Sequence, residues 1–198
     1  MSKQYFENNE ELISNPKEIT YYFRGKTITL TTDNGVFSKD AVDFGSSLML
    51  KQIDLNNKKT ILDVGCGYGV IGITMALFAH DATVTMVDVN ERAMELARSN
   101  AVKNGVNNVI VKESFAYQNV EGMFDLIVSN PPIRAGKAVV HEILEKSALH
   151  LNDGGEFYCV IQKKQGADSA IKKLKTVYNT VEVVATDKGY CIIKCQNK

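Results

Sequence analysis

The sequence predicts an α/β fold in which a mostly parallel β-sheet carries helices on both of its faces. From residue 59 onward, short apolar runs rich in β-branched residues alternate with stretches of helical periodicity, a pattern typical of parallel strands joined by helices. A glycine-rich turn at residues 65–69 follows the first run, as expected where a strand passes directly into a helix. Near the C-terminus, Asp187-Lys188-Gly189 indicates a hairpin turn, which adds at least one antiparallel strand.

The individual elements follow from the same patterns. Residues 19–31 are rich in Thr, Tyr and Ile around Arg24-Gly25-Lys26 and predict a hairpin, and Ser38 is placed to cap a helix over residues 39–53. Asn90 is placed to cap a helix that Gly105 would end. The further strands are expected at residues 59–64, 82–88, 108–113, 124–130, 155–162, 180–186 and 189–195, and the further helices at 69–80, 91–104, 141–150 and 167–177.

The composition narrows the class of protein. The chain has 198 residues, of which 44% are hydrophobic and 23% charged, with 23 basic residues against 23 acidic ones. These values exclude a disordered, collagen-like or generally polybasic protein, although a local basic face remains compatible with a neutral net charge. Since no apolar run is long enough to span a membrane, we expect a cytoplasmic protein with one domain over residues 1–198. It would comprise an N-terminal extension (1–57) and a catalytic core (58–198).

Cysteine and histidine patterns give no reason to expect a disulfide or a metal site. Cys66, Cys159, Cys191 and Cys195 form no CxxC pair, and they are interpreted as buried free thiols in a reducing compartment. The three histidines lack partners at the spacing of metal ligands.

A glycine loop between two carboxylates predicts a ligand site. Asp63-Val64-Gly65-Cys66-Gly67-Tyr68-Gly69 follows the strand at 59–64, and Asp88 closes the next strand, 25 positions after Asp63. In open α/β sheets, ligands bind beyond the carboxyl ends of the strands. Glycines allow the backbone to approach a ligand closely, and a carboxylate at Asp88 can accept hydrogen bonds from ribose hydroxyls.

The loop also matches a dinucleotide fingerprint, because Gly67-x-Gly69-x-x-Gly72 has the required spacing. A nicotinamide-dependent dehydrogenase is nevertheless disfavoured. The Asp63 carboxylate would repel a pyrophosphate and suits a cationic or amino-bearing ligand. The chain also offers no separate segment for a substrate domain.

A third motif, Asn130-Pro131-Pro132-Ile133, follows the strand at 124–130. Together with Asp63–Gly69 and Asp88, it makes the chain resemble class I S-adenosylmethionine-dependent methyltransferases. With Gly35-Val36-Phe37-Ser38-Lys39-Asp40 and Asp187-Lys188-Gly189-Tyr190 added, the chain is most similar to the small-subunit (16S) ribosomal RNA guanine-N2 methyltransferases.

The resemblance implies a Rossmann-like, doubly wound sheet of seven strands, with the last strand inserted antiparallel. It implies S-adenosyl-L-methionine as cofactor and ribosomal RNA or the small ribosomal subunit as substrate. The cofactor-binding residues that it implies are Asp63, Gly65, Gly67, Tyr68, Gly69, Asp88, Val89 and Ser114. For two of them an alternative stays open, since Tyr68 could belong to the loop surface and Ser114 could be a turn residue at a strand end.

The chemistry of methyl transfer explains the Asn-Pro-Pro motif. An exocyclic amine on a base is a poor nucleophile, and positive charge grows on its nitrogen during transfer. Acceptors aimed at the amine hydrogens therefore stabilise the transition state more than the ground state. The side-chain carbonyl of Asn130 and the backbone carbonyl of Pro131 are expected to be these acceptors, and Pro131-Pro132 restrict the loop to one extended conformation.

Substrate contacts are expected around this motif. Ile133 occupies a position that is often aromatic in the family, so Phe37 or Arg134 would stack on the base, or an apolar contact from Ile133 would suffice. Lys163 and Lys164 begin a local basic cluster that continues with Lys172, Lys173 and Lys175. The cluster would contact RNA phosphates, although a solvated helix face explains it equally simply.

Two alternative functions remain open. Asn-Pro-Pro motifs also occur in methyltransferases that act on the side-chain amide of a protein glutamine, which is likewise a planar, weakly nucleophilic NH₂ group. The chain could instead be a non-catalytic module that binds S-adenosylmethionine or RNA. Intact Asp63, Asp88 and Asn130 argue against such a degenerate copy.

Overall fold

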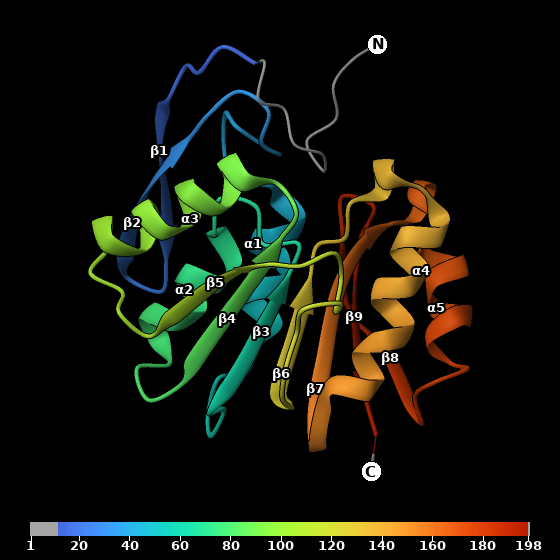
Figure 1. Ribbon diagram of the computed structural model, residues 1–198. Helices are drawn as coiled ribbons and strands as arrows, with labels where there is room; N and C mark the ends of the chain where they lie inside the picture. Colours follow the sequence, from blue (N-terminus) through green and yellow to red (C-terminus); the bar gives the residue numbers. More distant parts are fainter. Residues whose placement is uncertain (1–11, 198) are drawn as a thin grey trace.

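The computed structural model describes residues 12–197 of the chain. In this part, seven strands form one sheet in the order β5-β4-β3-β6-β7-β9-β8 (Figure 1). The strands are β3 (Thr60–Val64), β4 (Thr83–Asp88), β5 (Val109–Glu113), β6 (Phe124–Ser129), β7 (Leu151–Gln162), β8 (Thr180–Asp187) and β9 (Tyr190–Gln196). The last strand, β9, lies between β7 and β8 and runs antiparallel to both. The predicted sheet is therefore confirmed, including the inserted last strand.

Helices connect the strands as the periodicity predicts, with corrections to two of their boundaries. They are α1 (Phe44–Gln52), α2 (Val70–Phe78), α3 (Glu91–Lys103), α4 (Lys137–Lys146) and α5 (Ala167–Leu174). The expected helix over 39–53 with Ser38 as its cap is wrong, because Ser38 has a left-handed φ of 53°. The helix starts at Phe44 instead, where the side chain of Asp43 accepts a hydrogen bond from Ser46 N at 3.0 Å.

Short 3₁₀ turns replace some helical turns expected from the sequence. The segment expected as a helix over 141–150 begins earlier, at Lys137, and its last residues form η2 (Ser147–His150). Two other such turns, η1 (Ile133–Ala135) and η3 (Lys163–Gln165), follow β6 and β7 and thus lie beyond the carboxyl ends of these strands.

Alternating side chains of the sheet supply two hydrophobic cores. On one face, residues such as Ile61 and Val128 pack against α1, α2 and α3. On the other face, Leu62 and Ile127 pack against α4 and α5. Figure 1 shows these two layers of helices on opposite sides of the sheet. No helix within residues 12–197 is long and apolar enough to cross a membrane.

The predicted N-terminal hairpin is present as β1 (Lys17–Phe23) and β2 (Lys26–Thr32), which pair antiparallel. Helix α3 holds this hairpin through two asparagine side chains. The Asn100 amide donates to Thr31 O at 2.9 Å and accepts from Thr31 N at 2.7 Å, and Asn104 makes the same pair of bonds with Thr29. Asn100 also donates to Tyr68 O at 2.9 Å, which joins the hairpin to the glycine loop.

Candidate active site

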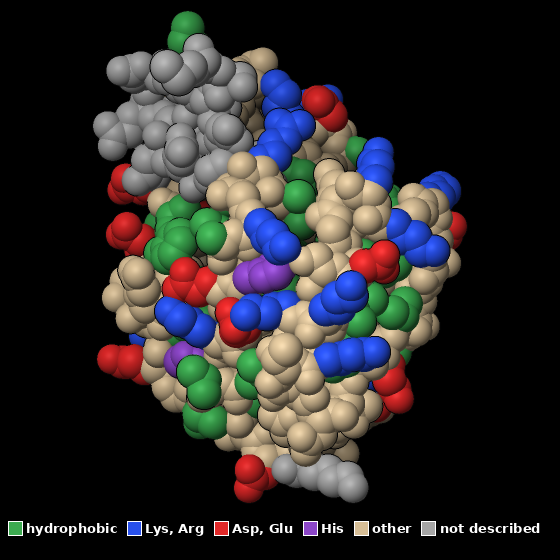
Figure 2. Space-filling model, turned by 90° about the vertical axis from the view of Figure 1, so that its right-hand side faces the viewer, with side chains coloured by type: hydrophobic (Ala, Val, Ile, Leu, Met, Phe, Trp, Pro, Cys, Tyr) green, Lys and Arg blue, Asp and Glu red, His purple; other side chains and the backbone are tan. Residues whose placement is uncertain are grey.

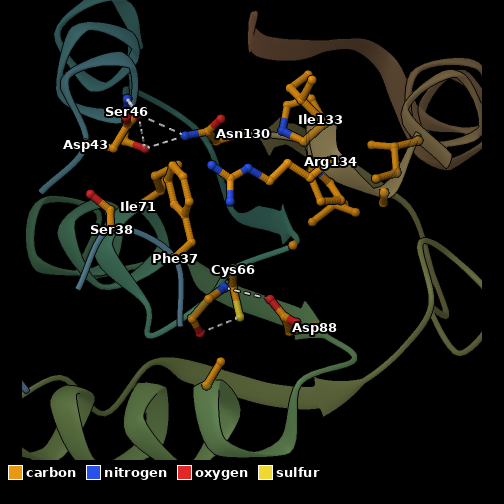
Figure 3. A pocket seen from close by; sticks show the side chains of 18 of the residues that line it. Phe37, Ser38, Asp43, Ser46, Cys66, Ile71, Asp88, Asn130, Ile133 and Arg134 are labelled. Atoms are coloured by element: carbon orange, nitrogen blue, oxygen red, sulfur yellow. Dashed lines mark hydrogen bonds between the residues drawn. The ribbon is translucent and has the colours of Figure 1, made fainter. Parts of the chain in front are cut away.

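A cavity of about 490 Å³ opens beyond the carboxyl ends of β3, β4 and β6. Most of the residues predicted from the sequence line it, and Figure 3 shows several of them around the opening. The predicted residues that line the cavity are Phe37, Gly65, Gly67, Tyr68, Asp88, Val89, Ser114, Asn130, Pro131, Pro132, Ile133 and Arg134. Asp63, Gly69, Lys163 and Lys164 do not belong to the lining.

The glycine loop takes a shape that other residues rarely adopt. Gly65, Gly67 and Gly69 have φ values of 73°, 54° and 97°. The amides of Gly65 and Cys66 donate to Val87 O at 2.9 and 3.0 Å, which fixes the loop to the end of β4. A Cβ at Gly65 or Gly67 would meet nothing within 4 Å, so the loop backbone borders open space that a ligand can approach.

Asp63 lies beneath the loop rather than at its mouth. Its side chain is fully buried, and Oδ2 accepts a hydrogen bond from Gly72 N at 2.9 Å. Within the described residues, Oδ1 has no hydrogen-bond partner. Burial, with the nearby charge of Asp88 adding to it, raises the pKa of Asp63 to about 7. Asp63 therefore anchors the start of α2 and acts on the cavity only across the loop.

The third glycine of the dinucleotide-like spacing has a packing role. A Cβ on Gly72 would collide with the side chain of Met86 and approach Asp63 Oδ2 to 3.2 Å. The match to the fingerprint thus arises from close packing of α2 on the sheet and needs no pyrophosphate.

Asp88 faces the cavity at the end of β4 with both oxygens already hydrogen-bonded. Oδ2 accepts from Gly67 N at 2.8 Å, and Oδ1 accepts from Val89 N and Asn90 N at 2.8 and 2.9 Å. Burial raises the pKa of Asp88, while these N–H bonds oppose the shift. Since a carboxylate oxygen accepts about two hydrogen bonds, Oδ2 retains capacity for one further donor such as a hydroxyl.

The Asn130 amide has a defined orientation. Its Nδ2 donates to Asp43 Oδ2 at 3.0 Å and to Ser46 Oγ at 2.9 Å (Figure 3). Both acceptors lie at the start of α1, so the amide carbonyl points to the opposite side. The neighbouring Ser129 donates to Val64 O at 2.8 Å, which fixes the end of β6 against β3.

Phe37, Ile133 and Arg134 form the wall next to Asn130. Phe37 is 38% exposed, and Figure 3 shows the guanidinium of Arg134 extending toward it and toward Asn130. The structure therefore brings together the two side chains that were expected to stack on a base in place of an aromatic residue at Ile133.

Ser114 and Tyr68 are engaged within the protein. Ser114 Oγ donates to Ala116 O and accepts from Asn119 N, both at 3.0 Å, which is the turn role that the sequence left open. The buried Tyr68 donates its hydroxyl to Ser38 O at 3.1 Å and thereby ties the loop that carries Phe37 to the glycine loop.

Lys163 and Lys164 lie beside the cavity on the exposed turn η3. Their neighbours Gln162 and Gln165 both line the cavity. Figure 2 shows a neighbouring face on which basic side chains alternate with acidic ones. Lys173 of the predicted cluster pairs with Glu145. Lys173 is therefore engaged in an ion pair, whereas Lys163 and Lys164 remain candidates for phosphate contact.

Sequence reasoning missed several polar residues of the cavity, among them Asp43, Ser46, Gln162 and Tyr190. Asp43 and Ser46 have the spacing of a helix cap, but the sequence pattern favours Ser38 as the cap. Gln162 ends β7 beside Asn130's strand, and in the described part of the chain its Oε1 is buried without a hydrogen-bond partner. Such an acceptor is available to an N–H group of a ligand.

A profile of the methyltransferase small domain family matches residues 27–194. The chain belongs to this family. The uncharacterized protein YbxB of Bacillus subtilis is 49% identical over 99% of both chains. The ribosomal RNA small subunit methyltransferase C of Citrobacter koseri is 34% identical over 70% of this chain and 41% of its own length. This methyltransferase small domain thus spans about two fifths of the latter relative.

Solved structures agree on the fold of the methyltransferase small domain. The Thermus thermophilus 16S rRNA N2 G1207 methyltransferase, solved in complex with AdoMet and guanosine, matches with a TM-score of 0.82 at 21% identity. The match covers 92% of this chain and 51% of that protein.

Proposed function

We propose that the protein transfers a methyl group from S-adenosylmethionine to the exocyclic N2 amine of a guanine in 16S ribosomal RNA. The observation that carries the proposal is the orientation of Asn130, whose carbonyl is left to accept a hydrogen bond from an amine. Family membership supports methyl transfer, and the names of the ribosomal RNA methyltransferase relatives favour RNA as the substrate.

The residues at β3 and β4 fit the cofactor. The glycine loop leaves space for close approach, and Asp88 Oδ2 keeps capacity for a ribose hydroxyl. A second hydroxyl would require the Gly67 N–H to release Asp88. Once ionised, the Asp63 carboxylate behind the loop favours a positively charged ligand. When bound, the cofactor supplies an electrophilic methyl group.

The residues at the end of β6 act on the acceptor. Asn130 Oδ1 and the Pro131 carbonyl accept the hydrogens of the amine and orient its lone pair. As the nitrogen becomes positively charged, these hydrogen bonds strengthen, which lowers the barrier. The proton can leave after transfer, so a strong general base is not required.

The choice of guanine rests on a second acceptor. Guanine presents an N1–H next to its N2 amine, whereas adenine presents an acceptor at N1. The buried Gln162 Oε1 is suited to the N1–H, since an unpaired buried carbonyl costs about 1–3 kcal/mol until a donor reaches it. Phe37 and Arg134 would hold the base by stacking. A paired guanine would have to be flipped out of its helix to reach this cavity.

Mass mapping of modified nucleosides tests the proposal. Small-subunit RNA from cells with and without the gene should differ by one N2-methylguanosine, and the purified protein should restore it on RNA or subunits from the deletion strain. Unchanged RNA, together with methylated glutamine in a cellular protein, would instead establish the glutamine alternative. Binding of S-adenosylmethionine without transfer to either acceptor would identify a binding module.

Charge reversal at Lys163 and Lys164 tests the RNA contact. We expect Lys163→Glu/Lys164→Glu to raise the KM for RNA and to flatten its salt dependence, because fewer counterions are released on binding. The Kd for S-adenosylmethionine should stay unchanged. Steady-state transfer assays between 50 and 200 mM salt give the KM for RNA and its dependence on salt. The matched control is Lys172→Glu/Lys175→Glu at the C-terminal end of α5, and an equal effect of the two pairs would remove Lys163 and Lys164 as specific contacts.

Asp88→Ala is expected to weaken S-adenosylmethionine binding by about 1.5–3 kcal/mol, the range for hydrogen bonds to a charged group. The loss includes both the ribose contact and the hold on Gly67 N. Isothermal titration calorimetry measures it, with the exposed Asp81→Ala as control. An unchanged Kd would exclude Asp88 from the cofactor site.

A further inference from the structure

The start of α1 holds the side-chain amide of Asn130 from the back of the cavity. Asp43 Oδ2 accepts from Asn130 Nδ2 at 3.0 Å and from Ser46 N at 3.0 Å, and Ser46 Oγ accepts from Asn130 Nδ2 at 2.9 Å. Asp43 and Ser46 precede Asn130 by 87 and 84 positions. The helix cap and the Asn-Pro-Pro motif are thus one cluster of hydrogen bonds (Figure 3).

The donors and acceptors in this cluster determine which end of the Asn130 amide faces the acceptor. An ionised carboxylate only accepts hydrogen bonds, so the group next to Asp43 must be the NH₂ of Asn130. Ser46 Oγ accepts the second hydrogen of this NH₂ group at 2.9 Å. Both hydrogens of the NH₂ group are therefore engaged, and Oδ1 is the end of the amide left for a donor in the cavity.

Without Asp43 and Ser46 as acceptors, the Asn130 amide would no longer prefer this orientation. Rotation by 180° would place its NH₂ toward the substrate, where two N–H groups would face the hydrogens of the target amine. In the observed structure that rotation would direct Oδ1 against the Asp43 carboxylate, and the two negative ends would repel each other. The charge of Asp43 also polarises the amide toward Oδ1, which makes that oxygen a stronger acceptor.

We propose that Asp43, with Ser46, is a positioning residue that fixes the Asn130 amide with its carbonyl toward the methyl acceptor. The inference rests on the proposed function for its effect on rate, whereas the orientation itself is independent of the substrate. It makes the N-terminal segment a part of the catalytic site.

Kinetic variants test the effect on rate. Asp43→Ser keeps a good helix cap but is too short to reach Asn130, and we expect kcat to fall roughly 10- to 100-fold with little change in the KM of the acceptor or the Kd of S-adenosylmethionine. Asp43→Asn retains an oxygen for both N–H donors without the charge and should recover part of the rate. Asp54→Ser, in the exposed loop after α1, is the matched control and should keep the parental rate.

A double-mutant cycle separates positioning from a general structural role. In the Asn130→Ala background, Asp43→Ser should lower kcat less than twofold, because the amide on which it acts is absent. The same 10- to 100-fold loss in both backgrounds would overturn the proposal, as would a parental rate for Asp43→Ser. Melting curves identify any variant whose loss comes from unfolding.

Nuclear magnetic resonance tests the orientation without a substrate. In ¹⁵N-labelled protein, the side-chain NH₂ of Asn130, assigned by its absence in Asn130→Ala, should exchange with water at least tenfold more slowly than that of exposed Asn57. Asp43→Ser should remove this protection. Protection without methylation of RNA would overturn the proposed function alone, whereas equal exchange at both asparagines would overturn the proposed orientation of the Asn130 amide.

Discussion

Asn130→Ala is expected to lower the single-turnover rate of methyl transfer by roughly 10²–10³-fold, the range for loss of one preorganised polar group at a developing charge. The carbonyl that faces the amine is lost, and the hydrogen bond that it makes strengthens only as nitrogen becomes cationic. The effect should therefore fall on the chemical step. Cofactor affinity should change little, because Asn130 contacts α1 and the acceptor side of the cavity.

Rapid-quench transfer assays with saturating RNA and cofactor measure this rate. Calorimetry and a melting curve on the same variant show whether binding and folding survive, as expected for a residue beyond the end of β6. Asn179→Ala replaces an exposed asparagine far along the chain and serves as control. A variant that transfers methyl at the parental rate would remove Asn130, and with it the physical reason for the Asn-Pro-Pro motif, from the mechanism.

Asp63→Asn is expected to become progressively more stable than the parent as the pH rises from 5 to 8. Burial raises the pKa of Asp63 to about 7, above its ordinary value. The native state therefore binds a proton that the unfolded state releases at lower pH. The stability linked to this proton is complete below pH about 4 and is lost as pH rises through 7, with an upper limit of about 4 kcal/mol.

Urea unfolding at pH 5, 6, 7 and 8 measures the difference between variant and parent. Asp125→Asn is the matched control, because hydrogen bonds from Lys59, Asn152 and Thr60 outweigh burial and lower the pKa of Asp125. Its difference from the parent should stay constant across this range. If the Asp63→Asn difference were also flat, Asp63 would be ionised throughout and the buried Oδ1 would be paired.

The sequence predicts the fold and most of the cavity because both follow from local patterns. Strand ends in a parallel sheet meet at one edge, so motifs after β3, β4 and β6 come together once the strands are located. Gly65, Asp88 and Asn130 were found in this way. The strand order β7-β9-β8 was available only through resemblance, since a terminal hairpin alone does not specify where it inserts.

The residues that orient Asn130 could not be found by such reasoning. Asp43 acts through a contact across 87 positions, and its local signal, a cap followed by helix α1, was assigned to Ser38. Ser38 instead takes a left-handed φ and donates to Ala41 O at 2.6 Å within a turn. For Asp63, the sequence indicates a carboxylate near the loop but not its depth, which depends on the packing of α2 against Met86.

The asparagine side chains at the end of α3 cover part of the outer edge of β2. A two-stranded hairpin exposes unpaired N–H and C=O groups along its outer edge, which another chain could extend into an intermolecular sheet. The amides of Asn100 and Asn104 occupy these groups at Thr31 and Thr29 as a neighbouring strand would. Any aggregate that grew from β2 would first have to detach α3, and with it the contact from Asn100 to the glycine loop. Resistance to aggregation and an intact cofactor loop therefore depend on the same side chain.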